Sequence, residues 1–221
     1  MAISKMIGAK IHRREDPRLV SGGGRYMDDF KRPNTTYAAF IRSPHAHAKI
    51  RMIDPTEAKQ APGVVAVFTA KDFEGVLMGP APVAPAFVAE KHTVPDRPPL
   101  PLDEVVYQGQ PVAMVIAESK AEAADAAALV QVDYEPLPAV MDLEKALDPS
   151  SPKAHTALPD NIAWDLVYNA DADSSFAEAE VTVKERILQQ RLAPTPMETR
   201  SVMAEWSPHE GSMTLWLSNQ G

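Results

Sequence analysis

The sequence predicts an α+β protein, in which a mixed domain of short helices and strands is followed by a region of antiparallel strands. Three observations carry this prediction. A strand–helix–strand pattern covers residues 111–135, and polar and apolar residues alternate over 180–192. In addition, 21 prolines among 221 residues favour many short elements over a long helical bundle.

The N-terminal third is expected to combine a loop-rich arm, residues 5–33, with short strands. The glycine run at 22–24 can turn the arm sharply, because glycine tolerates positive φ. Strands are predicted at residues 37–43, 49–53 and 64–69.

A short helix is predicted between the second and third of these strands. Asp54 can cap it, Pro55 fits its first turn and Glu57 can bond back to the cap. The Pro62-Gly63 pair is expected to end it.

The central segment contains the most regular unit. A buried strand at 111–118 leads to a capping box at Ser119 and Glu122, an alanine-rich helix to about residue 130 and a strand at 131–135. The seven prolines of 79–101 indicate either an ordered excursion across a surface or a flexible loop, and 142–147 is typical of a helical turn.

Residues 148–160 have the composition of a linker. We therefore predict four parts: an arm at 1–17, a mixed domain at 18–138, a linker at 139–160 and a second domain at 161–221. The elements expected in the second domain are a strand at 161–169, a helix at 174–179 capped by Asp173, the alternating strand at 180–192, and strands at 200–206 and 212–218. Some 60 residues rarely bury enough surface to stand alone, so we expect this domain to be truncated or completed by another chain.

Composition excludes several classes of function. The net charge of −8 argues against a general nucleic-acid binder, and no apolar run approaches the roughly 20 residues that span a bilayer. No secretory signal is visible, so a cytoplasmic location is expected. The absence of cysteine excludes disulfides, thiolate catalysis and iron–sulfur ligation by these residues.

Charge is uneven along the chain. Residues 1–51 carry 11 basic and 4 acidic side chains, whereas 52–221 carry 11 basic and 26 acidic ones. The basic arm could dock on an acidic partner or on the rest of this chain, or it could form a solvated surface.

Histidines and glycines offer weak candidate sites. His45 and His47 lie on one face of an extended segment and could begin a metal site, but packing or hydrogen bonding near the turn at 42–44 is favoured, since no third ligand has a recognisable spacing. The glycine run lacks the residues of a phosphate-binding loop, and no serine-nucleophile motif is present. The histidines expected in polar loop settings are His12, His92, His155 and His209.

The acidic pairs and the tryptophans are expected to have structural roles rather than catalytic ones. The acidic pairs, expected to be exposed, are Asp28-Asp29, Asp103-Glu104 and Asp171 with Asp173. The tryptophans, expected in the core, are Trp164, Trp206 and Trp216. Glu198 could pair with Arg200 or act as a functional carboxylate. Gln220, a neutral amide at a strand end, can donate to a metal-oxo or substrate oxygen, although such a residue usually meets water.

Seven short motifs, in a constant order from about residue 7 onward, resemble the large subunit of the molybdenum hydroxylases, the xanthine dehydrogenase, aldehyde oxidase and carbon monoxide dehydrogenase family. The residues of these motifs are most similar to those of the carbon monoxide dehydrogenase branch. The motifs are Arg14-Glu15-Asp16, Gly23-Gly24-Arg25-Tyr26-Met27-Asp28-Asp29, Arg42-Ser43-Pro44-His45-Ala46-His47-Ala48, Ala61-Pro62-Gly63-Val64, Gly109-Gln110-Pro111-Val112-Ala113, Val132-Asp133-Tyr134-Glu135-Pro136-Leu137-Pro138 and Pro196-Met197-Glu198.

This resemblance implies an α/β hammerhead domain followed by the start of a molybdopterin-binding domain. It also implies a molybdenum–molybdopterin cofactor that is contacted by Gln220 and Gly221, and the oxidation of a small-molecule substrate with a molybdenum-bound oxygen. Electrons would leave through FAD on a medium subunit and 2Fe–2S clusters on a small subunit.

The departures from the family pattern limit this expectation. The family's large subunits are several times longer, its general-base glutamate lies beyond residue 221, and the copper-binding cysteine of the carbon monoxide branch is absent. We therefore assign no catalytic residue and no metal ligand, and expect an oxidoreductase portion that needs a further polypeptide. The alternatives are a non-catalytic assembly or interaction module that keeps the hammerhead domain, and an independent metalloenzyme built on His45 and His47.

Overall fold

The computed structural model describes residues 11–76, 91–92, 97–165, 172–190 and 192–219. The chain forms two compact units. One is Asn34–Val183, and the other combines Met1–Pro33 with Lys184–Gly221. The predicted domains, by contrast, follow sequence pattern, so their boundaries at residues 18, 139 and 161 stay a prediction.

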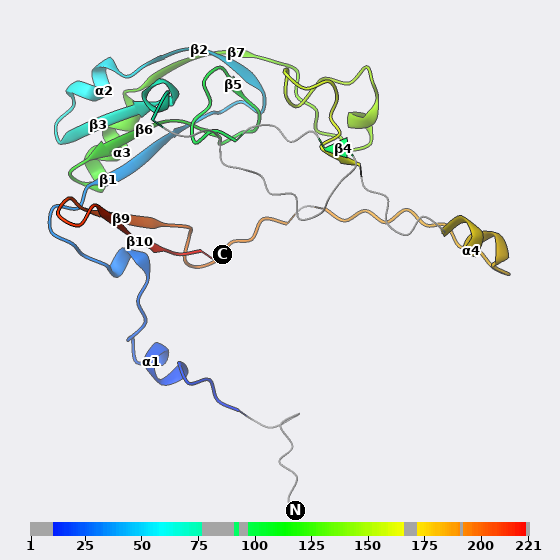
Figure 1. Cartoon of the computed structure of the whole chain (residues 1–221), viewed down its shortest axis with the longest axis horizontal. Helices are drawn as coiled ribbons and strands as arrows, with labels where there is room; N and C mark the ends of the chain where they lie inside the picture. The colour runs from blue at the N-terminus through cyan, green and yellow to red at the C-terminus, as the bar shows by residue number, and fades with distance from the viewer. Residues whose placement is uncertain (1–10, 77–90, 93–96, 166–171, 191, 220–221) are drawn as a thin grey trace, which may run out of the picture. The chain divides into compact units, whose positions relative to one another are not determined.

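The larger unit contains a three-stranded antiparallel sheet with β6 (Pro111–Ala117) between β1 (Tyr37–Arg42) and β3 (Val64–Thr69) (Figure 1). Helices α2 (Thr56–Gln60) and α3 (Lys120–Ala128) pack against it. Their shared core consists of Ala58, Val67, Ala113, Val115, Ala126 and Val130. The strands predicted at 37–43, 64–69 and 111–118 are thereby confirmed.

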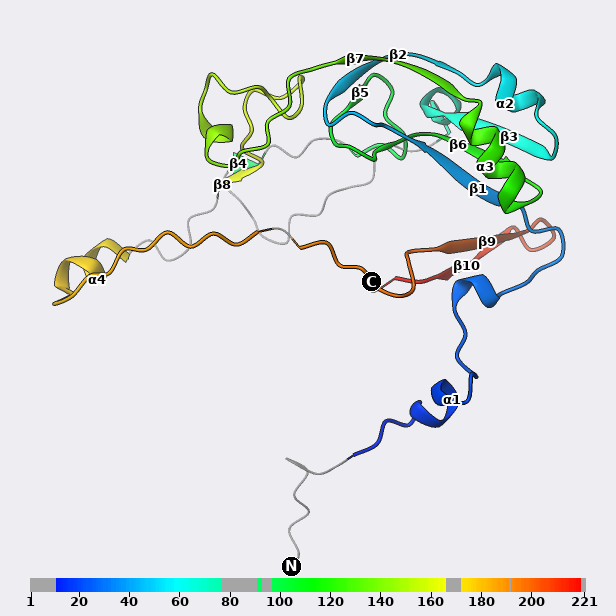
Figure 2. The same ribbon diagram turned by 180° about the vertical axis from the view of Figure 1, so that it is seen from behind.

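A second antiparallel sheet in this unit has the order β5 (Glu104–Val105), β2 (Ala48–Asp54), β7 (Gln131–Pro136). Figure 2 shows β2 and β7 side by side, as two curved ribbons. Its buried cluster is Ala48, Val105 and Val112. Because Val112 and Val115 belong to the two different clusters, the central strand β6 is shared between both cores. The predicted strands at 49–53 and 131–135 are confirmed.

Helices α2 and α3 start differently. The Ser119 hydroxyl accepts the N–H of Glu122 at 3.2 Å, as the capping box predicts, although α3 ends at Ala128, earlier than expected. In α2 the N-cap position is Pro55 rather than Asp54. Asp54 lies one residue earlier, because it still pairs in β2, and it accepts the N–H of Thr56 at 2.9 Å.

The segment after β7 contains short elements. A 3₁₀ turn, η3 (Lys145–Leu147), lies in the predicted helical turn, where the Asp142 carboxylate accepts the N–H of Glu144 at 2.9 Å. Strand β8 (Trp164–Asp165) pairs with β4 (Lys91–His92), and is shorter than predicted within the described residues. Helix α4 begins at Ala172 and ends at Glu178, so the prediction that Asp173 caps it is wrong. Most of the proline-rich stretch 79–101 lies outside the described residues.

The smaller unit is built around an antiparallel hairpin of β9 (Val202–Ser207) and β10 (Ser212–Leu217), as predicted. Its arm contains α1 (Asp16–Val20) and the 3₁₀ turn η1 (Met27–Asp29). The strand predicted at 180–192 is wrong for the described residues of that segment, which pair with no other strand. Alternation alone does not make a strand, because the backbone also needs a neighbour to bond.

Candidate functional site

The strand end that precedes Gln220 is fixed by serine side chains. Ser218 donates its N–H to the Ser201 carbonyl at 3.1 Å, and its hydroxyl donates to the Thr199 carbonyl at 2.9 Å. The same hydroxyl accepts the N–H of Ser201 at 2.8 Å. These bonds join the start of β9 to the end of β10. The predicted cofactor contacts Gln220 and Gly221 lie outside the described residues.

The two faces of the β9–β10 hairpin differ in chemistry. One face is wholly apolar and exposed, with side-chain exposure of 51% at Leu215 and 64% at Val202. We call it the apolar face; its members are Val202, Ala204, Trp206, Met213, Leu215 and Leu217. The prediction of a core position is therefore wrong for Trp206, whereas Trp216 on the other face is half-buried. The side chain of Trp164 lies outside the described residues.

The arm contacts the opposite face, which we call the arm face. The guanidinium carbon of Arg32 lies 5.1 Å from the ring centre of Trp216, and its Nε lies 3.7 Å from a carboxylate oxygen of Glu205. Glu205 and Trp216 share this face, because Glu205 pairs with Thr214 in the ladder. Arg32 therefore contacts this chain, as expected if the basic segment docks on the rest of the chain.

Glu198 binds the arm rather than Arg200. Its Oε1 accepts the backbone N–H of Met27 at 2.9 Å, and it is half-buried, whereas residues 192–197 before it are exposed. The expected Glu198–Arg200 ion pair is therefore wrong. The first N–H of a helical turn has no partner inside the turn, and Glu198 supplies one.

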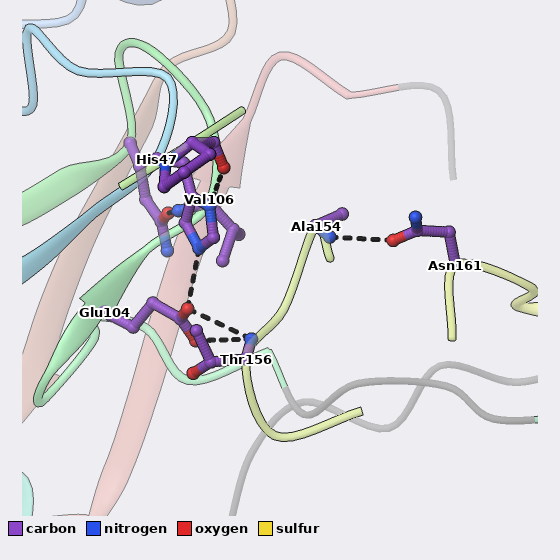
Figure 3. A network of polar contacts seen from close by, with 8 residues as sticks. His47, Glu104, Val106, Ala154, Thr156 and Asn161 are labelled. Atoms are coloured by element: carbon purple, nitrogen blue, oxygen red, sulfur yellow. Dashed lines mark hydrogen bonds and ion pairs between the residues drawn. The ribbon is translucent and has the colours of Figure 1, made fainter. Parts of the chain in front are cut away.

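A second polar cluster lies in the larger unit, where His47 contacts Glu104 (Figure 3). The Nε2 atom of His47 lies 2.7 Å from Oε1 of Glu104, and its Nδ1 lies 2.8 Å from the Pro138 carbonyl. Glu104 also accepts the N–H of Thr156 at 3.1 Å. The cluster thereby joins the residue before β2, strand β5 and the predicted linker.

Two pKa values in this cluster are shifted. Burial opposes the charge on Glu104, but the bonds from His47 and Thr156 outweigh it and lower the pKa of the carboxyl. Burial lowers the pKa of His155, against the attraction of Glu104, while His47 and Arg97 lower it further. Thus Glu104 is held as a carboxylate and His155 as a neutral ring.

The structure does not support a metal site on the histidine pair. Within the described residues, no group of three or more histidine, cysteine, aspartate or glutamate side chains could hold a metal ion. His45 instead meets the ring of Tyr134 edge-on at 5.2 Å, and His47 makes the hydrogen bonds that the sequence favoured. Of the other histidines, His12 and His209 are exposed, and the side chain of His92 lies outside the described residues.

The remaining sequence candidates are structural. Gly22 has φ of +76°, so the glycine run makes a turn, as expected. Asp28, Asp29 and Asp103 are exposed as predicted, but Glu104 is not. Sequence reasoning missed both Glu104–His47 and Glu198–Met27, because their members are 57 and 171 residues apart and no local pattern joins them.

Two family models match this chain. The α/β hammerhead domain of aldehyde oxidase and xanthine dehydrogenase matches residues 21–138, and the molybdopterin cofactor-binding domain matches residues 154–221. The chain belongs to the aldehyde oxidase and xanthine dehydrogenase family. No helix in the described part of the chain is long and apolar enough to cross a membrane.

Individual relatives agree with this assignment. The carbon monoxide dehydrogenase large chain of Afipia carboxidovorans is 36% identical over 95% of this chain and 27% of its own length. The nicotine 6-hydroxylase large subunit of Paenarthrobacter nicotinovorans is 37% identical over 97% of this chain and 26% of its own. A crystal structure of a copper- and molybdenum-containing carbon monoxide dehydrogenase superposes with a TM-score of 0.78, at 37% identity over 96% of this chain and 27% of that one. The chain thus spans about a quarter of the length of the relatives it matches.

Proposed function

We propose that this chain is the N-terminal portion of the molybdenum-cofactor-binding large subunit of a molybdenum hydroxylase, and that a further polypeptide completes its site. The observation that carries the proposal is the apolar face of the β9–β10 hairpin. Monomeric proteins rarely expose a continuous apolar patch of six side chains unless something binds it. In the proposal, the remainder of the large subunit covers this face.

The chemistry at the end of β10 fits a molybdenum–molybdopterin cofactor. Asn219 and Gln220 carry neutral amides and Gly221 has no side chain, so this segment offers N–H donors without adding charge. Ser218, directly before it, is fixed by its bonds to Thr199 and Ser201. We propose that Gln220 and Gly221 contact the cofactor, with the Gln220 amide donating to an oxygen on it.

When bound, the cofactor would supply the two-electron oxidation of a carbon substrate. The part of this chain would be to orient the cofactor through the Gln220 amide, with no acid or base provided. These 221 residues contain no cysteine and so ligate no iron–sulfur cluster, and in the proposal the clusters lie on a partner subunit. FAD and 2Fe–2S partner subunits and a cytoplasmic location are parts of this proposal. The substrate is left open, since the two relatives named above act on carbon monoxide and nicotine.

Co-expression of this chain with a candidate large-subunit remainder and the partner subunits tests the proposal. We expect a stable complex that contains molybdenum and molybdopterin and oxidises its substrate. Replacing Gln220 with alanine should lower kcat by about a hundredfold, as removal of one preorganised donor does. Gln108→Ala, an exposed glutamine of the larger unit, is the matched control.

Two results would contradict the proposal. A well-folded monomer that never recruits a partner argues against the need for a further polypeptide. A complex that assembles without molybdenum supports the alternative, a non-catalytic assembly module.

A further inference from the structure

We propose that Glu198 is a positioning residue, whose carboxylate fastens arm residues 26–32 to the β9–β10 hairpin and so holds the strand end that leads to Gln220. The inference rests on the proposed function, because it gives Glu198 a role toward the cofactor contact. Glu198 itself is not placed against the cofactor.

The first step is the bond between Glu198 and the arm. Met27 begins η1, a turn closed by the Asp29 carboxylate, which accepts the N–H of Tyr26 at 2.8 Å. The N–H of Met27 points out of this turn and reaches Glu198 at 2.9 Å. A hydrogen bond to a charged acceptor is about twice as strong as one between neutral groups. This bond therefore fixes a rigid turn to the chain just before β9.

The second step leads from Glu198 to the end of β10. The next residue, Thr199, accepts two hydroxyl bonds at its carbonyl, from Ser218 at 2.9 Å and from Ser201 at 3.0 Å. Ser218 is two residues before Gln220. A displacement of residues 198–199 must therefore also move or break the support of Ser218.

The third step is the second contact of the arm. Three residues after η1, Arg32 lies over Trp216 of β10 and near Glu205 of β9. The arm thus holds the hairpin at two places, the entry to β9 through Glu198 and the arm face through Arg32. The apolar face stays free for the remainder of the subunit. The arm and the remainder would then hold the hairpin from opposite sides.

Hydrogen exchange tests the positioning role without any measurement of activity. In the assembled complex, Glu198→Ala should raise the exchange rate by roughly tenfold in peptides covering 26–32 and 214–220, since a hydrogen bond to a charged group contributes about one power of ten to a local opening equilibrium. Glu198→Gln keeps a carbonyl acceptor and should restore most of the protection. Glu210→Ala, which removes a carboxylate bonded to Ser212 in the same hairpin, is the matched control and should leave both peptides unchanged.

A second variant removes the donor instead of the acceptor. Met27→Pro deletes the N–H together with the methionine side chain, and proline suits this position because it is the first of a helical turn and Tyr26 before it is extended. It should reproduce the exchange pattern of Glu198→Ala while leaving Glu198 in place. This agreement would exclude misfolding caused by the glutamate substitution.

A double-mutant cycle then joins Glu198 to Gln220. Glu198→Ala should lower kcat by roughly tenfold when Gln220 is present and have no further effect in a Gln220→Ala background, because residues that act as a unit are not additive. Unchanged exchange over 214–220, or an equal loss of kcat in both backgrounds, would overturn the positioning role. Faster exchange together with full activity of Gln220→Ala would instead overturn the proposed function, and with it any role of Glu198 toward the cofactor.

Discussion

Nε2 of His47 and Oε1 of Glu104 lie 2.7 Å apart in an almost buried pair, in which the side chain of His47 is 5% exposed and that of Glu104 14%. The other ring nitrogen of His47 contacts the carbonyl of Pro138. Each nitrogen of the His47 ring therefore faces an oxygen atom, one from a carboxylate and one from a backbone carbonyl. Glu104 of β5 thus joins the residue directly before β2 to the chain around Thr156.

Removing the Glu104 carboxylate should therefore destabilise the larger unit. Glu104→Ala leaves a buried nitrogen of the His47 ring without its polar partner, and we expect the free energy of unfolding to fall by about 3 kcal/mol. Urea unfolding of the 221-residue chain measures the loss. Asp103→Ala is the matched control, because that neighbouring carboxylate is exposed. Equal losses for the two variants would show that the His47–Glu104 pair contributes no more to the free energy of unfolding than an exposed carboxylate does.

Acid should weaken the same cluster in two stages. The pKa of His155 is lowered from 6.5 by burial, so the stability tied to its neutral form is complete above pH 6.5 and declines as the pH falls below that value. The pKa of Glu104 is lowered from 4.5, since its hydrogen bonds outweigh burial, and its share is lost as the pH falls through its lower folded value.

Urea midpoints measured from pH 7.5 to pH 3.5 check these signs. His155→Gln should remove the decline that begins near pH 6.5, and Glu104→Gln should reduce the one below pH 4.5. A chain that becomes more stable between pH 6.5 and pH 5 would contradict the direction given for His155.

The sequence predictions are correct where the interaction joins residues close in sequence, and they fail where it joins distant ones. Ser119 and Glu122 are three residues apart and predicted their helix correctly, because the capping bond is local. The alternating segment at 180–192 was expected to be a strand, but a strand also depends on a neighbour that no local pattern reveals. Its valines and leucines are exposed, with Val181 at 79% and Leu192 at 79%.

In the sequence, only the family resemblance indicates a cofactor contact, and that contact stays a prediction. The resemblance indicates Gln220, and Ser218, two residues before it, is fixed by hydrogen bonds with Thr199 and Ser201. The local sequence indicates Arg200, two residues away, as a partner of Glu198, whereas the structure pairs Glu198 with Met27. Contacts between distant segments form only once the chain is folded, and a single sequence carries no signal for them.

Replacing Gly63 with alanine should lower the free energy of unfolding by more than the cost of its positive φ alone. It has φ of +71°, which alanine adopts at a cost of about 1 kcal/mol, and an added Cβ would overlap the carboxyl group of Glu122. That carboxyl also bonds the Ser119 hydroxyl at 2.8 Å, so moving it disturbs the capping box of α3. We expect Gly63→Ala to lower the free energy of unfolding by about 2–3 kcal/mol in urea.

Gly109 provides the comparison. It lies in the same unit with φ of +87°, and an added Cβ there meets nothing within 4 Å. Gly109→Ala should therefore show the backbone cost alone, about 1 kcal/mol. If both variants lost the same stability, the Glu122 carboxyl group would move away from the added Cβ with little loss of free energy. The capping box would then contribute little to the stability of α3.

The apolar face of the β9–β10 hairpin determines how the chain should behave when it is isolated from other polypeptides. Leu215 and Leu217 are 51% and 55% exposed on that face, so the chain alone should bind a hydrophobic dye and self-associate. The double variant Leu215→Lys, Leu217→Lys should reduce both effects, as seen by dye fluorescence and sedimentation. Ser212→Lys adds a charge to the arm face and should change neither.

The same lysine pair should also abolish assembly with the large-subunit remainder, because burying two ammonium groups without partners costs several kcal/mol. Ser212→Lys should leave assembly intact. Lysines that suppressed self-association but still allowed a full complex would show that the remainder binds elsewhere. The apolar face would then be a contact between copies of this chain, and the observation that carries the proposed function would no longer support it.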